Sequence, residues 1–171
     1  HMVGNAALAA ACAWHHGVAP EAIATALSSA AVTKGRVQVK HWRGIVFLDD
    51  SYNANPDSMR AGLKTLAGMR VTGRRVAVLG RMGELGTLAE QGHREVGAFA
   101  ASAGMDALFT IGAEAAQISD AALTVPLRQN FPTHGECAAF LREWLRDGDA
   151  VLLKGSRSAG MEQVLTHLDP A

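Results

Sequence analysis

Short apolar runs alternate with amphipathic stretches along most of the chain. Five runs have the length of buried strands, at residues 37–39, 44–49, 75–79, 107–111 and 150–153. Between most of these runs lie longer segments in which apolar residues recur with helical spacing. Strands that alternate with helices in this way predict βαβ units. We therefore expect an α/β fold over residues 35–171, a Rossmann-like, mostly parallel sheet flanked by helices.

The first 34 residues follow a different pattern. Residues 3–14 are rich in alanine and have helical spacing, and Gly17 is placed to end that helix. Pro20 stands at a first helical position and begins a second helix, which we expect to run to about Ser29. Two short helices are too little for a domain. Residues 1–34 are therefore expected to be the helical tail of a domain that lies upstream.

Several polar residues predict where helices begin. Asn55 followed by Pro56 is typical of a cap and first turn. Thr87 and Thr133 are each followed three residues later by glutamate, which predicts two capping boxes. Ser158 is expected to cap the last helix.

Composition and charge narrow the classes of function. Sixteen basic residues balance sixteen acidic ones and aromatic residues make up 5%, which disfavours binding to nucleic acid. No apolar run reaches the roughly 20 residues of a membrane span, and no signal-peptide pattern opens the chain. Cys12 and Cys137 are far apart, so we expect two buried free thiols in a reducing cytoplasm. No spacing of cysteine or histidine residues predicts a metal site.

Three loops between a strand and a helix carry the candidate chemistry, at residues 49–56, 80–86 and 154–158. Ligands of an open α/β sheet bind beyond the carboxyl ends of its strands, so these loops should meet along one edge. In the first loop, Asp50 can accept hydrogen bonds from a ribose or help to organise a hydrated cation. The alternative is a polar loop in which Asn55 simply caps a helix.

The second loop has the glycine spacing G-x-x-G-x-x-G, which is not the dinucleotide fingerprint and is equally compatible with a tight turn. His93, just after it, is either a supporting or a purely structural residue. The third loop places Lys154 and Arg157 beside Ser156 at an expected helix start. Backbone N–H groups and two cations would suit an anion there, and the alternative is a solvated basic loop. No Gly-Lys dipeptide occurs, so the chain has no G-x-x-x-x-G-K-[ST] phosphate loop.

Taken together, the loops resemble one family, the UDP-N-acetylmuramoyl-tripeptide–D-alanyl-D-alanine ligases of the Mur ligase superfamily. The resemblance rests on LDDSYNANP at 48–56, GRMGELG at 80–86 and KGSRSAGME at 154–162. It extends to HMVGNAAL at 1–8 and KGR at 34–36, and so covers essentially the whole chain. The family pattern favours His1 as a native residue, although Met2 stands where asparagine is usual. Arg81 stands where an acidic residue is common.

The resemblance implies an ATP-dependent amide ligase with three domains in its full-length form, of which this chain is the C-terminal part. ATP and magnesium would activate the tripeptide carboxyl group as an acyl phosphate, which the amine of D-alanyl-D-alanine attacks. The nucleotide contacts implied by position are Asn5, Arg36 and Asp50. The contacts implied for the incoming substrate are Lys154, Ser156, Arg157 and Glu84. The supporting loop residues are Tyr52, Asn53 and Asn55.

The family's phosphate loop, magnesium ligands and UDP-sugar site would all lie upstream of this chain. We therefore expect no catalytic residue in it, no tightly bound cofactor and no turnover by it alone. Its partners would be ATP, UDP-N-acetylmuramoyl-tripeptide, D-alanyl-D-alanine and the upstream domains. Two other readings stay open: a sister ligase for tripeptide synthesis or folate polyglutamylation, and a non-catalytic α/β domain that binds a small molecule.

Overall fold

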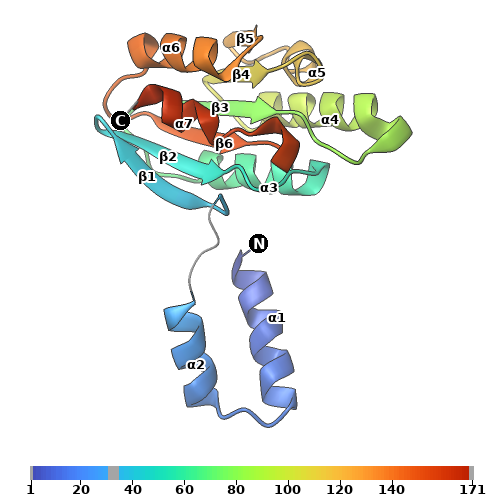
Figure 1. Cartoon of the computed structure of the whole chain (residues 1–171), viewed down its shortest axis with the longest axis vertical. Coiled ribbons are helices and arrows are strands. Elements are labelled where there is room, and N and C mark those ends of the chain that lie inside the picture. Colours follow the sequence, from blue (N-terminus) through green and yellow to red (C-terminus); the bar gives the residue numbers. More distant parts are fainter. Residues whose placement is uncertain (1, 31–34, 170–171) are drawn as a thin grey trace. The chain divides into compact units, whose positions relative to one another are not determined.

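The computed structural model describes residues 2–30 and 35–169, which fall into two compact units divided between residues 33 and 34 (Figure 1). His1 and Lys34, which carry part of the family resemblance, lie outside the described residues.

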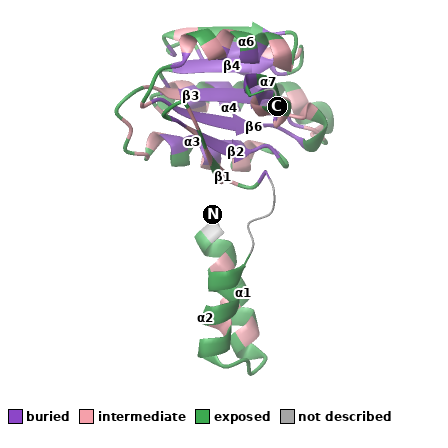
Figure 2. Cartoon of the chain, turned by 60° about the vertical axis from the view of Figure 1, so that its left-hand side comes forward, coloured by how far each residue is buried: buried purple, intermediate pink, exposed green. Residues whose placement is uncertain are grey.

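The first unit is a pair of helices, α1 (Met2–His15) and α2 (Pro20–Ser29). Gly17 ends α1 with φ +81°, and Pro20 occupies the first turn of α2, as the sequence predicts. None of the described residues of these helices is buried, and both are largely green in Figure 2. The expectation that both cysteines are buried is therefore wrong for Cys12, which lies exposed on α1.

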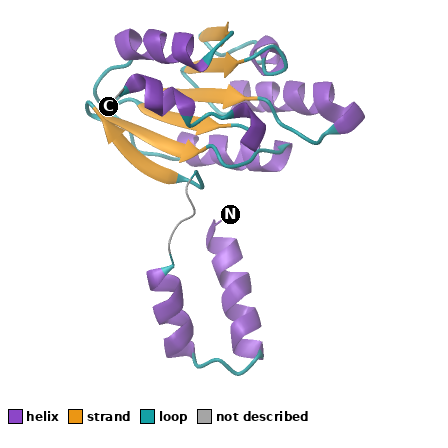
Figure 3. Cartoon of the chain, in the orientation of Figure 1, coloured by secondary structure: helices purple, strands orange, loops and turns teal. Residues whose placement is uncertain are grey.

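The second unit contains a six-stranded sheet with the strand order β1-β2-β6-β3-β4-β5. Its strands are β1 (Gln38–Trp42), β2 (Ile45–Asp50), β3 (Arg75–Gly80), β4 (Ala107–Ile111), β5 (Leu127–Phe131) and β6 (Ala150–Lys154). Only β1 runs antiparallel to its neighbour, so the predicted mostly parallel sheet is confirmed (Figure 3). Val37, expected at the start of the first strand, instead has the left-handed φ of +49°.

Helices cover both faces of the sheet. They are α3 (Pro56–Ala67), α4 (Ala89–Ser102), α5 (Ala116–Ala121), α6 (His134–Trp144) and α7 (Gln163–Leu168). Side chains alternate along each strand, so Ala77 and Leu79 pack against α3, α4 and α5, while Val76 and Val78 pack against α6 and α7. Each fully buried Leu or Val contributes about 1.5–3 kcal/mol. Both cores hold the edge of the sheet, and the loops at it, in place.

Two of the predicted helix caps are confirmed. The Asn55 side chain accepts the Ser58 backbone N–H at 2.8 Å, and the Ser58 hydroxyl accepts the Asn55 N–H at 3.0 Å, which completes a capping box. The Thr133 hydroxyl accepts the Glu136 N–H at 3.2 Å at the start of α6. The Glu136 carboxylate accepts from the Thr133 hydroxyl at 2.9 Å and not from the Thr133 N–H, so the predicted cap is present without the reciprocal bond of a capping box.

The other two predicted caps are wrong. Short 3₁₀ turns, η1 (Gly86–Leu88) and η2 (Arg157–Ala159), precede α4 and α7. Thr87 and Ser158 lie inside these turns, and the residues that flank the two helices make no side-chain cap. The α-helices therefore begin later than the polar residues indicate.

Candidate functional site

The carboxyl ends of β2, β6 and β3 lie next to one another. Asp50 on β2 and Leu79 on β3 are both register partners of Lys154 on β6. The chain leaves β2 and β3 toward α3 and α4 on one face, but it leaves β6 toward α7 on the other. Neighbouring strands whose connections leave to opposite faces open the crevice in which α/β proteins bind ligands. The fold thus places the candidate site at the end of β6.

The three candidate loops touch one another at this edge. The Ser156 N–H donates to the Arg81 carbonyl at 2.9 Å, and the Arg81 guanidinium donates to the Ser158 hydroxyl at 2.8 Å. On the other side, the Lys154 ammonium donates to the Asn53 carbonyl at 2.9 Å. The predicted convergence of the loops is confirmed.

Two glycines let the second and third loops approach closely. A Cβ on Gly80 would lie 2.5 Å from the Met161 sulfur, and one on Gly155 would lie 2.6 Å from the Met161 Cγ. Neither position has room for a larger residue. Glycine in these motifs therefore allows the loops to pack against the Met161 side chain.

Asp50 and Lys154 form a buried ion pair. The Lys154 Nζ lies 2.5 Å from Asp50 Oδ2, and the side chains are 2% and 9% exposed. The other oxygen of Asp50 accepts the Val37 N–H at 3.2 Å. Lys154 is therefore buried and paired within the protein. From the sequence we expected it in a basic loop open to a ligand or to solvent.

The neighbouring carboxylate, Asp49, points to the opposite face of β2 and is only 1% exposed. It accepts hydrogen bonds from the Lys40 ammonium at 2.6 Å, the Ser51 hydroxyl at 2.6 Å and the Ser51 N–H at 3.3 Å. The two consecutive aspartates thus serve two separate local structures, and Asp49 accepts three hydrogen bonds in its own.

Of the other expected nucleotide contacts, Arg36 is exposed and stacks on the Tyr52 ring, with its guanidinium carbon 4.5 Å from the ring centroid. The Tyr52 N–H donates to the Gly35 carbonyl at 2.9 Å, which fixes this segment against the first loop. A cation over an aromatic face is held in place but keeps its hydrogen-bond donors available. Asn5 is exposed on α1, in the other unit.

Within the first loop, the Asn53 side chain accepts the N–H of Ala54 at 2.8 Å. Asn55, as described above, caps α3. Both residues shape the loop through its backbone, as expected of supporting residues.

Glu84 lies at the tip of the glycine loop with φ +62°, a left-handed conformation that is uncommon for residues other than glycine. It is exposed, and within the described part of the chain no hydrogen bond or ion pair engages its carboxylate. Such a strained, unengaged residue is typical of a functional position.

His93 holds the glycine loop through a hydrogen bond to its backbone. It is 1% exposed, its Nε2 accepts the Met82 N–H at 2.9 Å, and its Nδ1 lies 2.6 Å from the Ala89 carbonyl, to which it donates. These partners assign the tautomer with the proton on Nδ1. His93 therefore positions the loop backbone and does not reach a ligand.

Arg157 is the most accessible cation of the third loop, with its side chain 72% exposed and a long 3.4 Å contact to Glu162. Arg157 lies in the 3₁₀ turn η2 and not, as the sequence led us to expect, at the N-terminus of an α-helix. Ser156 is 4% exposed, and its hydroxyl lies 3.1 Å from that of Ser158. Anion binding here would thus depend on the guanidinium of Arg157.

One ion pair at this edge was not predicted from the sequence. Arg81 donates to both carboxylate oxygens of Glu114, at 2.9 and 3.2 Å. Glu114 follows the carboxyl end of β4, so the rule that selected the other three loops would also have selected this residue. Arg81 thereby links the loops that follow β3, β4 and β6.

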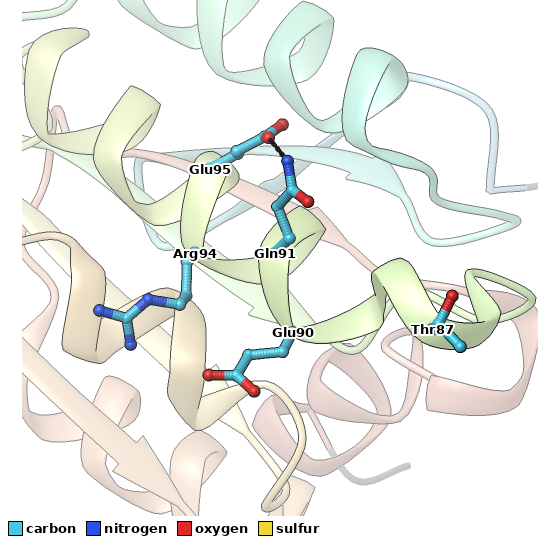
Figure 4. Close-up of a pocket in the computed structure, with 5 residues that line it drawn as sticks. All are labelled: Thr87, Glu90, Gln91, Arg94 and Glu95. Atoms are coloured by element: carbon cyan, nitrogen blue, oxygen red, sulfur yellow. Dashed lines mark hydrogen bonds between the residues drawn. The ribbon is translucent and has the colours of Figure 1, made fainter.

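A pocket lies on α4 and η1 (Figure 4). It is lined by Thr87, Glu90, Gln91, Arg94 and Glu95, and Gln91 donates to Glu95 at 2.8 Å. None of the expected site residues lines it.

Among residues 2–30 and 35–169, no group of three or more histidine, cysteine or acidic residues is placed to hold a metal ion. No helix in the same ranges is long and apolar enough to cross a membrane.

Known proteins resemble this chain along nearly its whole length. The family model of the Mur ligase glutamate ligase domain matches residues 35–157. A curated relative, the UDP-N-acetylmuramoyl-tripeptide–D-alanyl-D-alanine ligase of Bacillus subtilis, is 34% identical across 98% of this chain. That match covers 38% of the relative, so the chain spans about two fifths of its length.

Solved structures of MurF ligases also align with this chain. A MurF crystal structure from Acinetobacter baumannii aligns over 98% of this chain and 37% of its own, with a TM-score of 0.84 and 33% identity. MurF ligase from Thermotoga maritima in complex with ADP aligns over 83% of this chain and 32% of its own, with a TM-score of 0.70 and 29% identity.

Proposed function

The chain belongs to the Mur ligase family, and from that premise we propose that it is the C-terminal part of the ligase that adds D-alanyl-D-alanine to UDP-N-acetylmuramoyl-tripeptide. The observation that carries the proposal is the meeting of the three motif loops at the end of β6, the ligand-binding edge of an α/β sheet. The name of the Bacillus subtilis relative supports this choice of substrate.

We further propose a division of the chain between two domains. Residues 35–171 would form the ligase domain that delivers the incoming substrate, and residues 1–34 would close the central ATPase domain. The apolar groove between α1 and α2 supports the second assignment, because a helix pair without buried residues gains little stability by itself. The groove is lined by Ala10, Ala11, Trp14, Pro20, Ile23, Ala24 and Leu27.

On the nucleotide side, we propose contacts from Asp50, Arg36 and Asn5. The residues present fit such a ligand. Asp50 receives two donors, which leaves part of its acceptor capacity for a ribose hydroxyl. Arg36 and Asn5 are exposed and can donate hydrogen bonds. On family grounds, the triphosphate and its magnesium would be held upstream. The complex of the Thermotoga maritima relative with ADP agrees with nucleotide binding in the family.

On the other side, the exposed charges match the incoming dipeptide, which carries a carboxylate and an amino group. Arg157 can pair with the carboxylate, and Glu84 can hold the amino end. Ser156 would line the same crevice. In the reaction, the amine attacks the activated carboxyl carbon of the tripeptide. The new C–N bond forms, the bond to phosphate breaks, and the amine loses a proton.

A panel of amino substrates tests this proposal. Phosphate release by the full-length protein would be measured with ATP, magnesium and UDP-N-acetylmuramoyl-tripeptide, and with D-alanyl-D-alanine, a diamino acid or glutamate as acceptor. We expect release with the dipeptide only, and release with another acceptor would favour a sister ligase. We also propose that the enzyme is cytoplasmic, which agrees with its two free cysteines.

The non-catalytic reading makes a different prediction for the 171-residue chain by itself. A self-sufficient binding domain would bind ATP or the dipeptide tightly. We expect the chain to be folded and to show no turnover. Its dissociation constant for ATP should be millimolar or weaker, which corresponds to a binding free energy of about −4 kcal/mol or less favourable. Calorimetry distinguishes the two, and micromolar binding would contradict the proposal.

A further inference from the structure

The side chain of Lys154 is almost completely buried. Its side chain is 2% exposed, and its ammonium group donates to Asp50 and to the Asn53 carbonyl. Its stem packs against α3, where a Cβ on Gly62 would lie 3.3 Å from the Lys154 Cδ. Burying an ammonium group is costly unless it is paired, and Lys154 already has its partners within the protein. It therefore needs no ligand to compensate its charge.

The contacts of Lys154 join parts of the chain that lie far apart in sequence. Through Asp50 it reaches the Val37 N–H, which the second carboxylate oxygen accepts at 3.2 Å. Through the Asn53 carbonyl it holds the backbone of the first loop. The orientation of the Asp50 carboxylate is thus fixed by one donor on each oxygen.

We propose that Lys154 is a positioning residue for the nucleotide side, which holds Asp50 and the first loop in their binding geometry and does not touch the incoming dipeptide. This inference rests on the proposed function, in which Asp50 contacts the nucleotide. With one donor on each oxygen, about two lone-pair sites of Asp50 remain unused, and 9% of its side chain is exposed. Without Lys154, Asp50 becomes an unpaired buried charge, which is expected to turn toward solvent.

The test is the separation of two Michaelis constants in the full-length ligase. We expect Lys154→Met to raise the KM for ATP about tenfold or more and to leave the KM for D-alanyl-D-alanine within about twofold. A raised dipeptide KM with an unchanged ATP KM would overturn the proposal and make Lys154 a direct contact. Two unchanged constants would overturn it as well.

Lys40→Met is the matched control. Lys40 also pairs with a strand-end aspartate, at 2.6 Å, but that partner is Asp49 on the opposite face of β2. We expect this variant to leave both Michaelis constants unchanged. An equal rise in the ATP KM from Lys40→Met would show a general loss of strand-end order and would contradict a specific role for Lys154.

Two further measurements keep the test decisive if the single variant folds poorly. The double variant Lys154→Met/Asp50→Leu removes both buried charges and should fold. Because it also removes the proposed nucleotide contact, its ATP KM should be raised, and a normal ATP KM would contradict the contact of Asp50 on which the proposal rests.

Amide hydrogen exchange in the 171-residue chain tests the positioning step without any assumption about the reaction. In Lys154→Met, the Val37 amide should exchange at least about tenfold faster, while the Ser51 amide held by Asp49 should not. If the full-length protein lacks ligase activity, the proposed function fails, but this measurement still decides whether Lys154 fixes Asp50. Unchanged exchange at Val37 would show that it does not.

Discussion

The two ends of the sheet each hold a buried aspartate beside a cation, and they differ in how completely the carboxylate is used. At the amino end of β6, Asp149 accepts four hydrogen bonds, three from Arg74 and one from the Arg146 N–H. At the carboxyl end of β2, Asp50 accepts two. A carboxylate offers about four lone-pair sites. Asp149 is therefore saturated, and Asp50 is half-filled.

The surroundings follow the same division. Arg74 is also stacked on Trp144, with 3.5 Å between its guanidinium carbon and the ring centroid, and donates to the Trp144 carbonyl. At the carboxyl end, Arg157 and Glu84 are exposed. Burial and charge alone do not separate a structural carboxylate from a binding one. The number of acceptor sites that remain unused on each carboxylate does distinguish the two. From this number we infer that the amino end of the sheet stabilises the fold and that the carboxyl end binds ligands.

The largest expected effect is at the amino end. Asp149→Ala should lower the free energy of unfolding by about 3–5 kcal/mol, because it removes the acceptor of a buried, multiply hydrogen-bonded pair. Urea unfolding of the 171-residue chain measures this change. A loss below about 1 kcal/mol would contradict a structural role for Asp149.

Arg157→Ala should act on function and leave stability unchanged. In the full-length ligase we expect kcat/KM for D-alanyl-D-alanine to fall about 10- to 150-fold, the cost of one charge-assisted pair of roughly 1.5–3 kcal/mol. The ATP KM should stay the same. A raised ATP KM with an unchanged dipeptide KM would reassign Arg157 to the nucleotide side.

Acid should weaken the amino-end pair selectively. Burial by itself raises the pKa of Asp149, but the hydrogen bonds from Arg74 and Arg146 and the charge of Arg74 outweigh it and leave that pKa below its ordinary value. A lowered pKa in the folded state stabilises the fold above the unfolded-state pKa of about 3.9, and this stabilisation is lost as the pH falls through the folded-state pKa. The difference in unfolding free energy between wild type and Asp149→Asn should therefore shrink below about pH 4. A difference that is independent of pH would contradict this origin.

The smallest effect separates a real helix cap from an apparent one at the carboxyl end. Thr133→Ala should cost about 1 kcal/mol, because it removes the acceptor for the Glu136 N–H. Thr87→Ala should cost less than about 0.5 kcal/mol, because Thr87 lies in η1 and caps no helix. Equal costs in thermal unfolding would show that the hydrogen bond at Thr133 is unimportant.

Much of the fold could be predicted because its signals are local. The 107–111 run is β4, and Asn55 with Pro56 marks the start of α3. Local signals failed at Thr87 and Ser158, where a 3₁₀ turn delays the helix. Such a turn depends on how the loop packs against the rest of the domain. At this edge, for example, Gly80 and Gly155 pack against Met161.

The site was predicted as a set of loops, but the direction of individual side chains was not. Lys154 ends a strand that is buried on both faces, so alternation along the strand gave no sign of where its side chain points. Its burial depends on Gly62 in α3 and on Asp50 in β2, both distant in sequence. Contacts of this kind require the tertiary structure.

Ligand binding at the carboxyl ends of β2, β6 and β3 can be tested by nuclear magnetic resonance of the isotope-labelled 171-residue chain, titrated with ATP and then with D-alanyl-D-alanine at millimolar concentration. We expect amide shifts to change in the three loops at 50–55, 81–86 and 155–158, with ATP acting mainly on the first and the dipeptide on the other two. We expect constant shifts at Arg74 and Asp149. Shift changes centred on the amino end of the sheet, or on the α4 pocket of Glu90 and Arg94, would contradict binding at the carboxyl end.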